Sequence, residues 1–96
     1  MPATPERIGL IAGNGRFPLL FAEAARRAGV EVIAVAHQGE TPDEIVNLVT
    51  QLTWVRVGEL GKIIRVLKQA GVQRAVMAGG IRKPRQLSDF RPDLRG

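Results

Sequence analysis

The chain has 96 residues and a formal net charge of +5, with 45% hydrophobic and 24% charged residues. A chain of this length forms one domain at most, and this composition belongs to a folded globular protein rather than to a disordered one. It contains no cysteine and one histidine, which excludes disulfides, thiolate metal sites and histidine-rich zinc sites.

The positive charge is concentrated at the carboxyl-terminal end. Residues 82–96 carry +3 of it, because five basic residues there face two acidic ones: Arg82, Lys83, Arg85, Arg91 and Arg95 against Asp89 and Asp93. This distribution favours a basic tail or a local anion site over a nucleic-acid-binding face. The first residues lack a signal-peptide pattern and no apolar run is long enough for a membrane span, so a cytoplasmic protein is expected.

The first part of the chain predicts a βαβ unit. Residues 7–12 (RIGLIA) and 31–37 (EVIAVAH) are apolar at nearly every position, which is typical of parallel strands buried on both faces. Residues 18–29 (PLLFAEAARRAG) between them predict a helix, with proline in the first turn and glycine at the end.

The second part predicts two more strands and a helix. A short helix is expected at residues 43–46, started by Asp43 and Glu44, and residues 52–57 (LTWVRV) predict a third strand near a sheet edge, with Trp54 as a packing residue. Residues 58–71 form the clearest helix, and residues 74–78 (RAVMA) predict the fourth strand. Four apolar residues of this helix recur at the spacing i, i+3, i+4, i+7 and form one stripe, which we interpret as core rather than as an interaction face. These residues are Leu60, Ile63, Ile64 and Leu67.

The predicted fold class is α/β, a Rossmann-like three-layer half-domain with a four-stranded parallel sheet in the order 3-2-1-4 and a basic carboxyl-terminal tail. Residues 1–6 form an amino-terminal arm, residues 7–81 the α/β domain, and residues 82–96 a basic loop or tail. A doubly wound sheet needs helices on both faces, and only two good helices are predicted. We therefore expect the domain to continue beyond this chain or to be covered by a partner.

Two loops share one pattern. Residues 11–18 (IAGNGRFP) and 77–84 (MAGGIRKP) each follow a predicted strand and read apolar, Ala, Gly, x, x, Arg, x, Pro. In the order 3-2-1-4 the first and fourth strands are neighbours, and their carboxyl ends form the switch point where open α/β sheets bind ligands. Glycines admit a ligand to the backbone, the helix after Gly15 favours an anion, and Arg16 and Arg82 offer phosphate-binding guanidinium groups. A phosphate or diphosphate between the loops is the predicted ligand.

Other interpretations of these residues stay open. Glycine after a strand is frequent because strand-to-helix turns are tight. A dinucleotide fingerprint fits poorly, because Pro18 replaces its third glycine and an acidic ribose-binding residue is lacking at the end of the second strand, although Glu40 is close. His37 could touch a ligand or act as an acid or base, or it is simply a polar residue at a strand end.

The predicted cleft contains no pair of carboxylates. The acidic candidates lie in the second crossover and in the tail: Glu40, Asp43, Glu44, Asp89 and Asp93. The residues therefore predict a site that holds an anion and lacks the groups to cleave it.

Four segments together resemble a known enzyme family: IGLIAGNGRFPLLFAEAARRAG, VIAVAHQGET, WVRVGELGKIIRVLKQAGV and VMAGGIRKP. In this order and spacing they are similar to the amino-terminal domain of the UDP-2,3-diacylglucosamine diphosphatases of the LpxI type, bacterial enzymes of lipid A biosynthesis. The resemblance covers residues 7–85.

The resemblance implies a cytoplasmic, magnesium-dependent hydrolase that splits UDP-2,3-diacylglucosamine into UMP and lipid X, acting at the inner-membrane surface to reach its lipid substrate. It implies two domains around the substrate, with the catalytic and Mg²⁺-binding carboxylate in a carboxyl-terminal domain outside this chain, so that the chain alone is inactive. The positions that match the cleft-facing loops are Gly13, Asn14, Gly15, Arg16, Phe17, Gly79, Gly80 and Arg82. No catalytic or metal-binding residue is assigned here.

Two other functional readings are kept beside this one. The first is a stand-alone module that binds a nucleotide or sugar phosphate without a catalytic domain. The second is nucleic-acid binding through the basic tail, which the near-neutral body of the chain disfavours. Whether the chain forms a homodimer is left open by the sequence.

Overall fold

The structure is a computed structural model that describes residues 6–81. The elements follow one another along the chain as β1 (Arg7–Ala12), α1 (Phe17–Arg27), β2 (Glu31–His37), the 3-10 helix η1 (Asp43–Asn47), β3 (Gln51–Val55), α2 (Leu60–Gln69) and β4 (Ala75–Ala78). Each predicted strand and helix is present, with ends shifted by at most two residues. Both helices end two residues before a glycine with positive φ, 78° at Gly29 and 76° at Gly71, because only glycine adopts this conformation at no steric cost.

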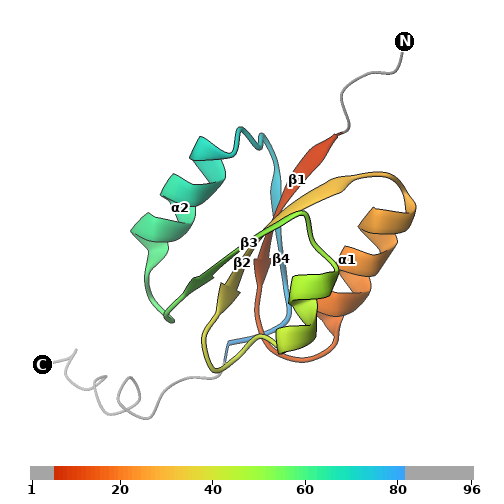
Figure 1. Cartoon of the computed structure of the whole chain (residues 1–96). Helices are drawn as coiled ribbons and strands as arrows, with labels where there is room; N and C mark the ends of the chain where they lie inside the picture. The colour runs from red at the N-terminus through yellow and green to blue at the C-terminus, as the bar shows by residue number, and fades with distance from the viewer. Residues whose placement is uncertain (1–5, 82–96) are drawn as a thin grey trace, which may run out of the picture.

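The four strands form one parallel sheet in the order β3-β2-β1-β4, which confirms the predicted topology. The central strand β1 pairs with β2 from Arg7 opposite Glu31 to Ala12 opposite Ala36, and with β4 from Gly9 opposite Ala75 to Ala12 opposite Ala78. Helices α1 and η1 cover one face of the sheet and α2 covers the other, so the domain has three layers (Figure 1). The chain turns from one face to the other between β3 and β4 because right-handed crossovers in opposite directions need opposite faces.

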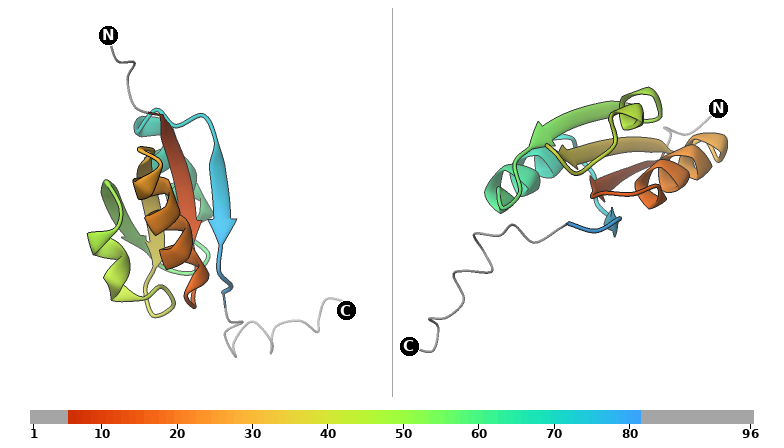
Figure 2. Two further views of the ribbon diagram at one scale, coloured as in Figure 1. Left: turned by 90° about the vertical axis from the view of Figure 1, so that its right-hand side faces the viewer. Right: turned by 90° about the horizontal axis from the view of Figure 1, so that it is seen from below.

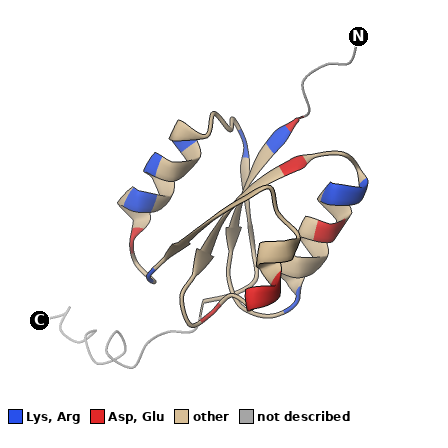
Figure 3. Cartoon of the chain, viewed as in Figure 1, with Lys and Arg blue, Asp and Glu red and all other residues tan. Residues whose placement is uncertain are grey.

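Each face of the sheet has its own apolar core. On the α1 face, Leu10, Val32 and Ile45 are fully buried and Trp54 packs against their cluster, as predicted for that residue. On the α2 face, Ile33, Val35 and Val55 of the strands meet Ile63 and Leu67 of the helix. Charged residues lie mainly on the helices and at the ends of strands (Figure 3). Strand β2 is buried from Val32 to His37 because both of its faces are covered.

The prediction that the whole stripe of α2 is core is wrong for two of its four members. Ile63 and Leu67 are 4% and 8% exposed, whereas Leu60 and Ile64 are 68% and 58% exposed. The reason is the position of the helix. Helix α2 packs on β2 and β3, and its other apolar edge is turned toward β1 and β4, where no helix formed by residues 6–81 covers this face of the sheet. Strand β4 forms the edge of the sheet beside β1 (Figure 2).

Candidate functional site

The two glycine loops meet at the carboxyl-terminal edge of the sheet. The amide of Gly13 donates to the carbonyl of Ala78 over 2.8 Å, and the amide of Asn14 donates to the carbonyl of Gly80 over 2.7 Å. Asn14 and Gly80 form a short antiparallel bridge just beyond the parallel pairing of β1 and β4. The predicted juxtaposition of the two loops at the switch point is confirmed.

The glycines of the two loops allow the backbones of these loops to pack directly against each other. A Cβ atom on Gly13 would lie 2.3 Å from the carbonyl oxygen of Gly80, and one on Gly79 would lie 2.4 Å from the carbonyl oxygen of Asn14. Gly79 also has a φ of 91°. The backbones of the two loops therefore touch at Gly13 and Gly79, and the binding of a phosphate or diphosphate at these loops stays a prediction.

Asn14 holds the two loops and the β2 crossover together. Its Nδ2 donates to Oε1 of Glu40 over 3.0 Å, and its Oδ1 accepts from the amide of Gly80 over 3.2 Å. Both ends of the side-chain amide thus bond within the protein. Asn14 therefore acts as a clasp between the loops and the β2 crossover, and its predicted contact with a ligand stays a prediction.

The open part of the first loop is the turn that leads into α1. Gly15 has a φ of 82° and a Cβ there would meet no atom within 4 Å, and the following side chains of Arg16 and Phe17 are exposed. The first turn of α1 holds no acidic residue and buries Pro18. The positive end of the helix dipole and the charge of Arg16 therefore face the same open region. Arg82, the arginine of the second loop, lies outside the described residues.

His37 belongs to a buried network at the ends of β1 and β2. Its Nδ1 lies 2.8 Å from the carbonyl oxygen of Ala12, which also accepts from the hydroxyl of Thr41 over 2.8 Å. Because a carbonyl oxygen only accepts, Nδ1 must carry a proton and donate it to this oxygen. Sequence reasoning overlooked Thr41, whose hydroxyl also accepts from the amide of His37 over 2.9 Å. The sequence showed only that a threonine lies four residues after the end of this strand, which does not predict its hydrogen bond to His37.

An apolar groove of about 280 Å³ begins beside the loops, with Gly13, Gly79 and His37 in its wall. It continues between α2 and the edge of the sheet, where its lining includes Ile11, Ile64 and Met77. We call it the β4 groove. The joined glycine loops and the end of β2 thus border an apolar groove.

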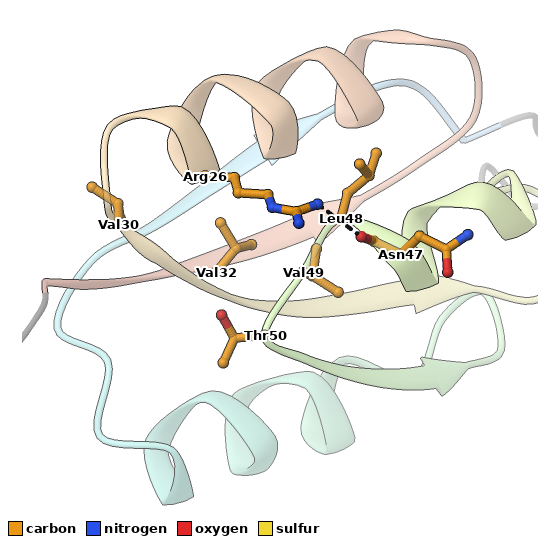
Figure 4. A pocket seen from close by; sticks show the side chains of 7 residues that line it. All are labelled: Arg26, Val30, Val32, Asn47, Leu48, Val49 and Thr50. Carbon is orange, nitrogen blue, oxygen red and sulfur yellow. Dashed lines mark hydrogen bonds between the residues drawn. The ribbon is translucent and has the colours of Figure 1, made fainter.

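A second cavity lies at the amino-terminal end of β2, away from the glycine loops. It has a volume of about 230 Å³ and is lined by the end of α1, the start of β2 and the segment before β3 (Figure 4). Arg26 donates to the carbonyl of Asn47 across it over 3.3 Å. Parallel sheets bind ligands at the carboxyl ends of their strands, so we assign the candidate site to the glycine loops.

At the start of α2, the surroundings of the Glu59 carboxyl shift its pKa. The amide of Arg56 donates to its Oε1 over 2.7 Å. This hydrogen bond lowers the pKa of the Glu59 carboxyl; slight burial opposes the effect, and the charges of Lys62 and Arg56 add to it. The carboxylate stabilises the amino-terminal end of α2. Among residues 6–81 no three acidic or histidine side chains lie close enough together to hold a metal ion.

Comparison with known proteins agrees with this architecture. The model of the LpxI N-terminal domain family matches residues 7–96. UDP-2,3-diacylglucosamine pyrophosphatase LpxI of Caulobacter vibrioides is 32% identical over 90 residues, which cover 94% of this chain and 31% of that protein. The chain thus spans less than a third of the length of this relative. These matches confirm the resemblance that the loop and helix segments indicated, and the chain belongs to the LpxI N-terminal domain family.

Proposed function

We propose that the chain is the amino-terminal, substrate-embracing part of a UDP-2,3-diacylglucosamine diphosphatase of lipid A biosynthesis, which hydrolyses UDP-2,3-diacylglucosamine to UMP and lipid X. Family membership and the name of the Caulobacter relative support this activity. The observation that carries the assignment to this chain is the pair of glycine loops joined at the switch point, beside the amino-terminal end of α1.

The proposed role of the loops is to bind and orient the substrate. Amides at Gly15 and in the first turn of α1, together with the Arg16 guanidinium, neutralise negative oxygens of the diphosphate. Phe17 is exposed beside them and offers a flat apolar surface to the uridine or sugar. Gly79 and Gly80 shape the neighbouring wall, and Arg82 adds a second guanidinium from the other loop.

Hydrolysis itself is assigned to the rest of the longer protein. In this proposal the catalytic carboxylate and Mg²⁺ belong to the part of the polypeptide that follows this segment. The described residues support no step through a metal, because they offer no cluster of three ligands. The protein would work in the cytoplasm at the surface of the inner membrane. Residues 6–81 contain no helix that is both long and apolar enough to cross a membrane.

The test is the affinity for UDP-2,3-diacylglucosamine, measured by calorimetry on a protein that contains this segment and is active with Mg²⁺, with the metal chelated so that the substrate is bound but not hydrolysed. Replacing Arg16 or Arg82 by alanine should raise Kd by about tenfold to a hundredfold each, because a charge-assisted hydrogen bond contributes about 1.5–3 kcal/mol. The matched control is Arg27→Ala, an exposed arginine at the other end of α1, which should leave Kd unchanged.

Two results would contradict this proposal. An unchanged Kd in the Arg16→Ala/Arg82→Ala double variant would remove the loops from the binding site. Release of UMP by the purified 96-residue chain would contradict the division of labour between the two parts. If the chain instead binds UDP as tightly alone as within a longer protein, and the longer protein has no hydrolytic activity, the stand-alone nucleotide-binding module is favoured.

A further inference from the structure

Among the described residues that line the β4 groove, His37 alone has a nitrogen or oxygen atom in its side chain. It is the last residue of β2 and is only 5% exposed. In the wall of the groove it lies together with Gly13 and Gly79 of the two loops. A few polar groups in an otherwise apolar pocket commonly fix the orientation of a ligand.

The ring of His37 is held in one orientation. Its Nδ1 donates to the carbonyl of Ala12 over 2.8 Å, and the backbone amide of His37 donates to the hydroxyl of Thr41 over 2.9 Å. The same carbonyl already accepts from the Thr41 hydroxyl, and a carbonyl oxygen can accept two hydrogen bonds. The bond from Nδ1 is therefore not required to satisfy a buried acceptor. Its effect is to orient the imidazole beside the base of the first loop.

The second ring nitrogen of His37, Nε2, is available to a ligand. No residue between 6 and 81 forms a hydrogen bond with Nε2, and every buried side-chain nitrogen and oxygen in this range has a partner. Nε2 is therefore accessible from outside the protein. Because Nδ1 carries a proton, the acceptor of the uncharged ring is Nε2. The structure thus presents one fixed hydrogen-bond acceptor at the carboxyl end of β2.

The carboxyl end of β2 is the place where related α/β folds hold a ribose. In dinucleotide-binding folds, an acidic residue about 20 residues after the glycine loop accepts a hydrogen bond from a ribose hydroxyl. His37 occupies this position, on the strand next to β1. The nearby carboxylate of Glu40 already accepts from the side chain of Asn14. An uncharged imidazole nitrogen also accepts from a hydroxyl, so Nε2 can replace the missing carboxylate.

We propose that His37 is a positioning residue whose Nε2 accepts a hydrogen bond from a ribose hydroxyl of a nucleoside diphosphate bound at the joined loops. This inference rests on the proposed function, because it needs the diphosphate at Arg16 and the start of α1. The oriented ring selects a ribonucleotide over a deoxyribonucleotide. It also determines that the nucleoside lies on the β2 side of the loops. Ala12 and Thr41 contribute by holding the ring.

The experiment compares the affinity of UDP with the affinities of 2′-deoxy-UDP and 3′-deoxy-UDP. Calorimetry is done at about pH 8, where free imidazole is uncharged, on a protein that contains this segment and is active with Mg²⁺, with the metal chelated. One deoxy analogue should bind about fivefold to fiftyfold more weakly than UDP, because it leaves Nε2 without a donor. His37→Asn should bind UDP and this analogue equally, since the asparagine amide can still donate to Ala12 but places no acceptor at Nε2.

Two further measurements separate ligand contact from folding. Gln38→Ala changes the exposed next residue and should keep the preference for UDP, and thermal denaturation should show that H37N remains folded. Nitrogen NMR of the unsubstituted protein, labelled at histidine, needs no variant. The Nε2 resonance of His37, identified by its absence in H37N, should move when UDP is added and should stay in place with the weaker analogue.

The outcomes distinguish this inference from the proposed function. Equal affinities for UDP and both analogues, with a Kd that Arg16→Ala still raises, would overturn the role of His37 and leave the proposed function in place. A preference for UDP that persists in H37N, with an unmoved Nε2 resonance, would assign the ribose to another residue and also overturn it. Absence of UDP binding, or binding that Arg16→Ala leaves unchanged, would contradict the proposed function and this inference together.

Discussion

The Cβ position of Gly13 lies 2.3 Å from the carbonyl oxygen of Gly80, so the loops after β1 and β4 are packed backbone against backbone. Gly13→Ala must push the loops apart or strain them, and we expect it to destabilise the fold by about 1–3 kcal/mol, as overpacking commonly does. Urea denaturation of the 96-residue chain measures this. Gly61→Ala is the matched control, because a Cβ there meets no atom within 4 Å and the helix should gain about 0.5–1 kcal/mol. Equal stability of G13A and the parent chain would contradict the close contact.

The clasp formed by Asn14 predicts a repairable defect. Asn14→Asp replaces the amide that donates to Glu40 with a second carboxylate only about 3 Å from the first, and like charges at this distance repel each other. We expect the variant to lose about 1–3 kcal/mol of unfolding free energy at neutral pH, since the donor of a half-buried hydrogen bond is also lost. Adding Glu40→Gln restores a donor and should recover most of this loss. A double-mutant cycle by urea denaturation measures the coupling, and additive effects of the two substitutions would exclude the clasp.

The hydroxyl of Thr41 predicts a difference between two conservative substitutions. Thr41→Val keeps the shape but leaves the buried amide of His37 without its acceptor, which costs about 1–3 kcal/mol. Thr41→Ser keeps the hydroxyl and should lose much less. Thermal denaturation of the two variants tests this, and nitrogen NMR of the His37 ring in the parent chain should find the proton on Nδ1. Equal stability of the valine and serine variants would show that the network does not stabilise the fold.

Two adjacent isoleucines of α2 should respond very differently to truncation. Ile63 is buried against β2 and β3, and Ile63→Ala should cost about 2–5 kcal/mol because it leaves a cavity. Ile64 is mostly exposed in this chain, and Ile64→Ala should change the stability by less than about 0.5 kcal/mol. The urea denaturation midpoints of the two variants test which side of α2 faces the core. Similar losses for both would return Ile64 to the core, as the sequence pattern had suggested.

The elements of the fold and the neighbourhood of the two loops follow from local features of the sequence. Apolar runs such as residues 31–37 can be strands only in a sheet covered on both faces. In the predicted order 3-2-1-4 the first and fourth strands are neighbours, and the structure brings Gly13 and Gly80 to one edge in this way. These features act within one element or through a general rule of handedness, and for that reason they could be recognised without coordinates.

Contacts between distant segments were decided by the tertiary structure alone. The apolar stripe of a helix does not show which of its residues will contact the sheet. Because α2 packs over β2 and β3, Ile63 is buried and Ile64 is exposed. In the same way, the hydrogen bond from the amide of Asn14 to Glu40 depends on how closely two distant loops approach each other. The sequence by itself determined the strands, the helices and the glycine-rich loops that follow the first and fourth strands, because periodicity and turn residues are local features. Only packing determined how these loops are held and which surface stays open, because such contacts depend on residues far apart in the chain.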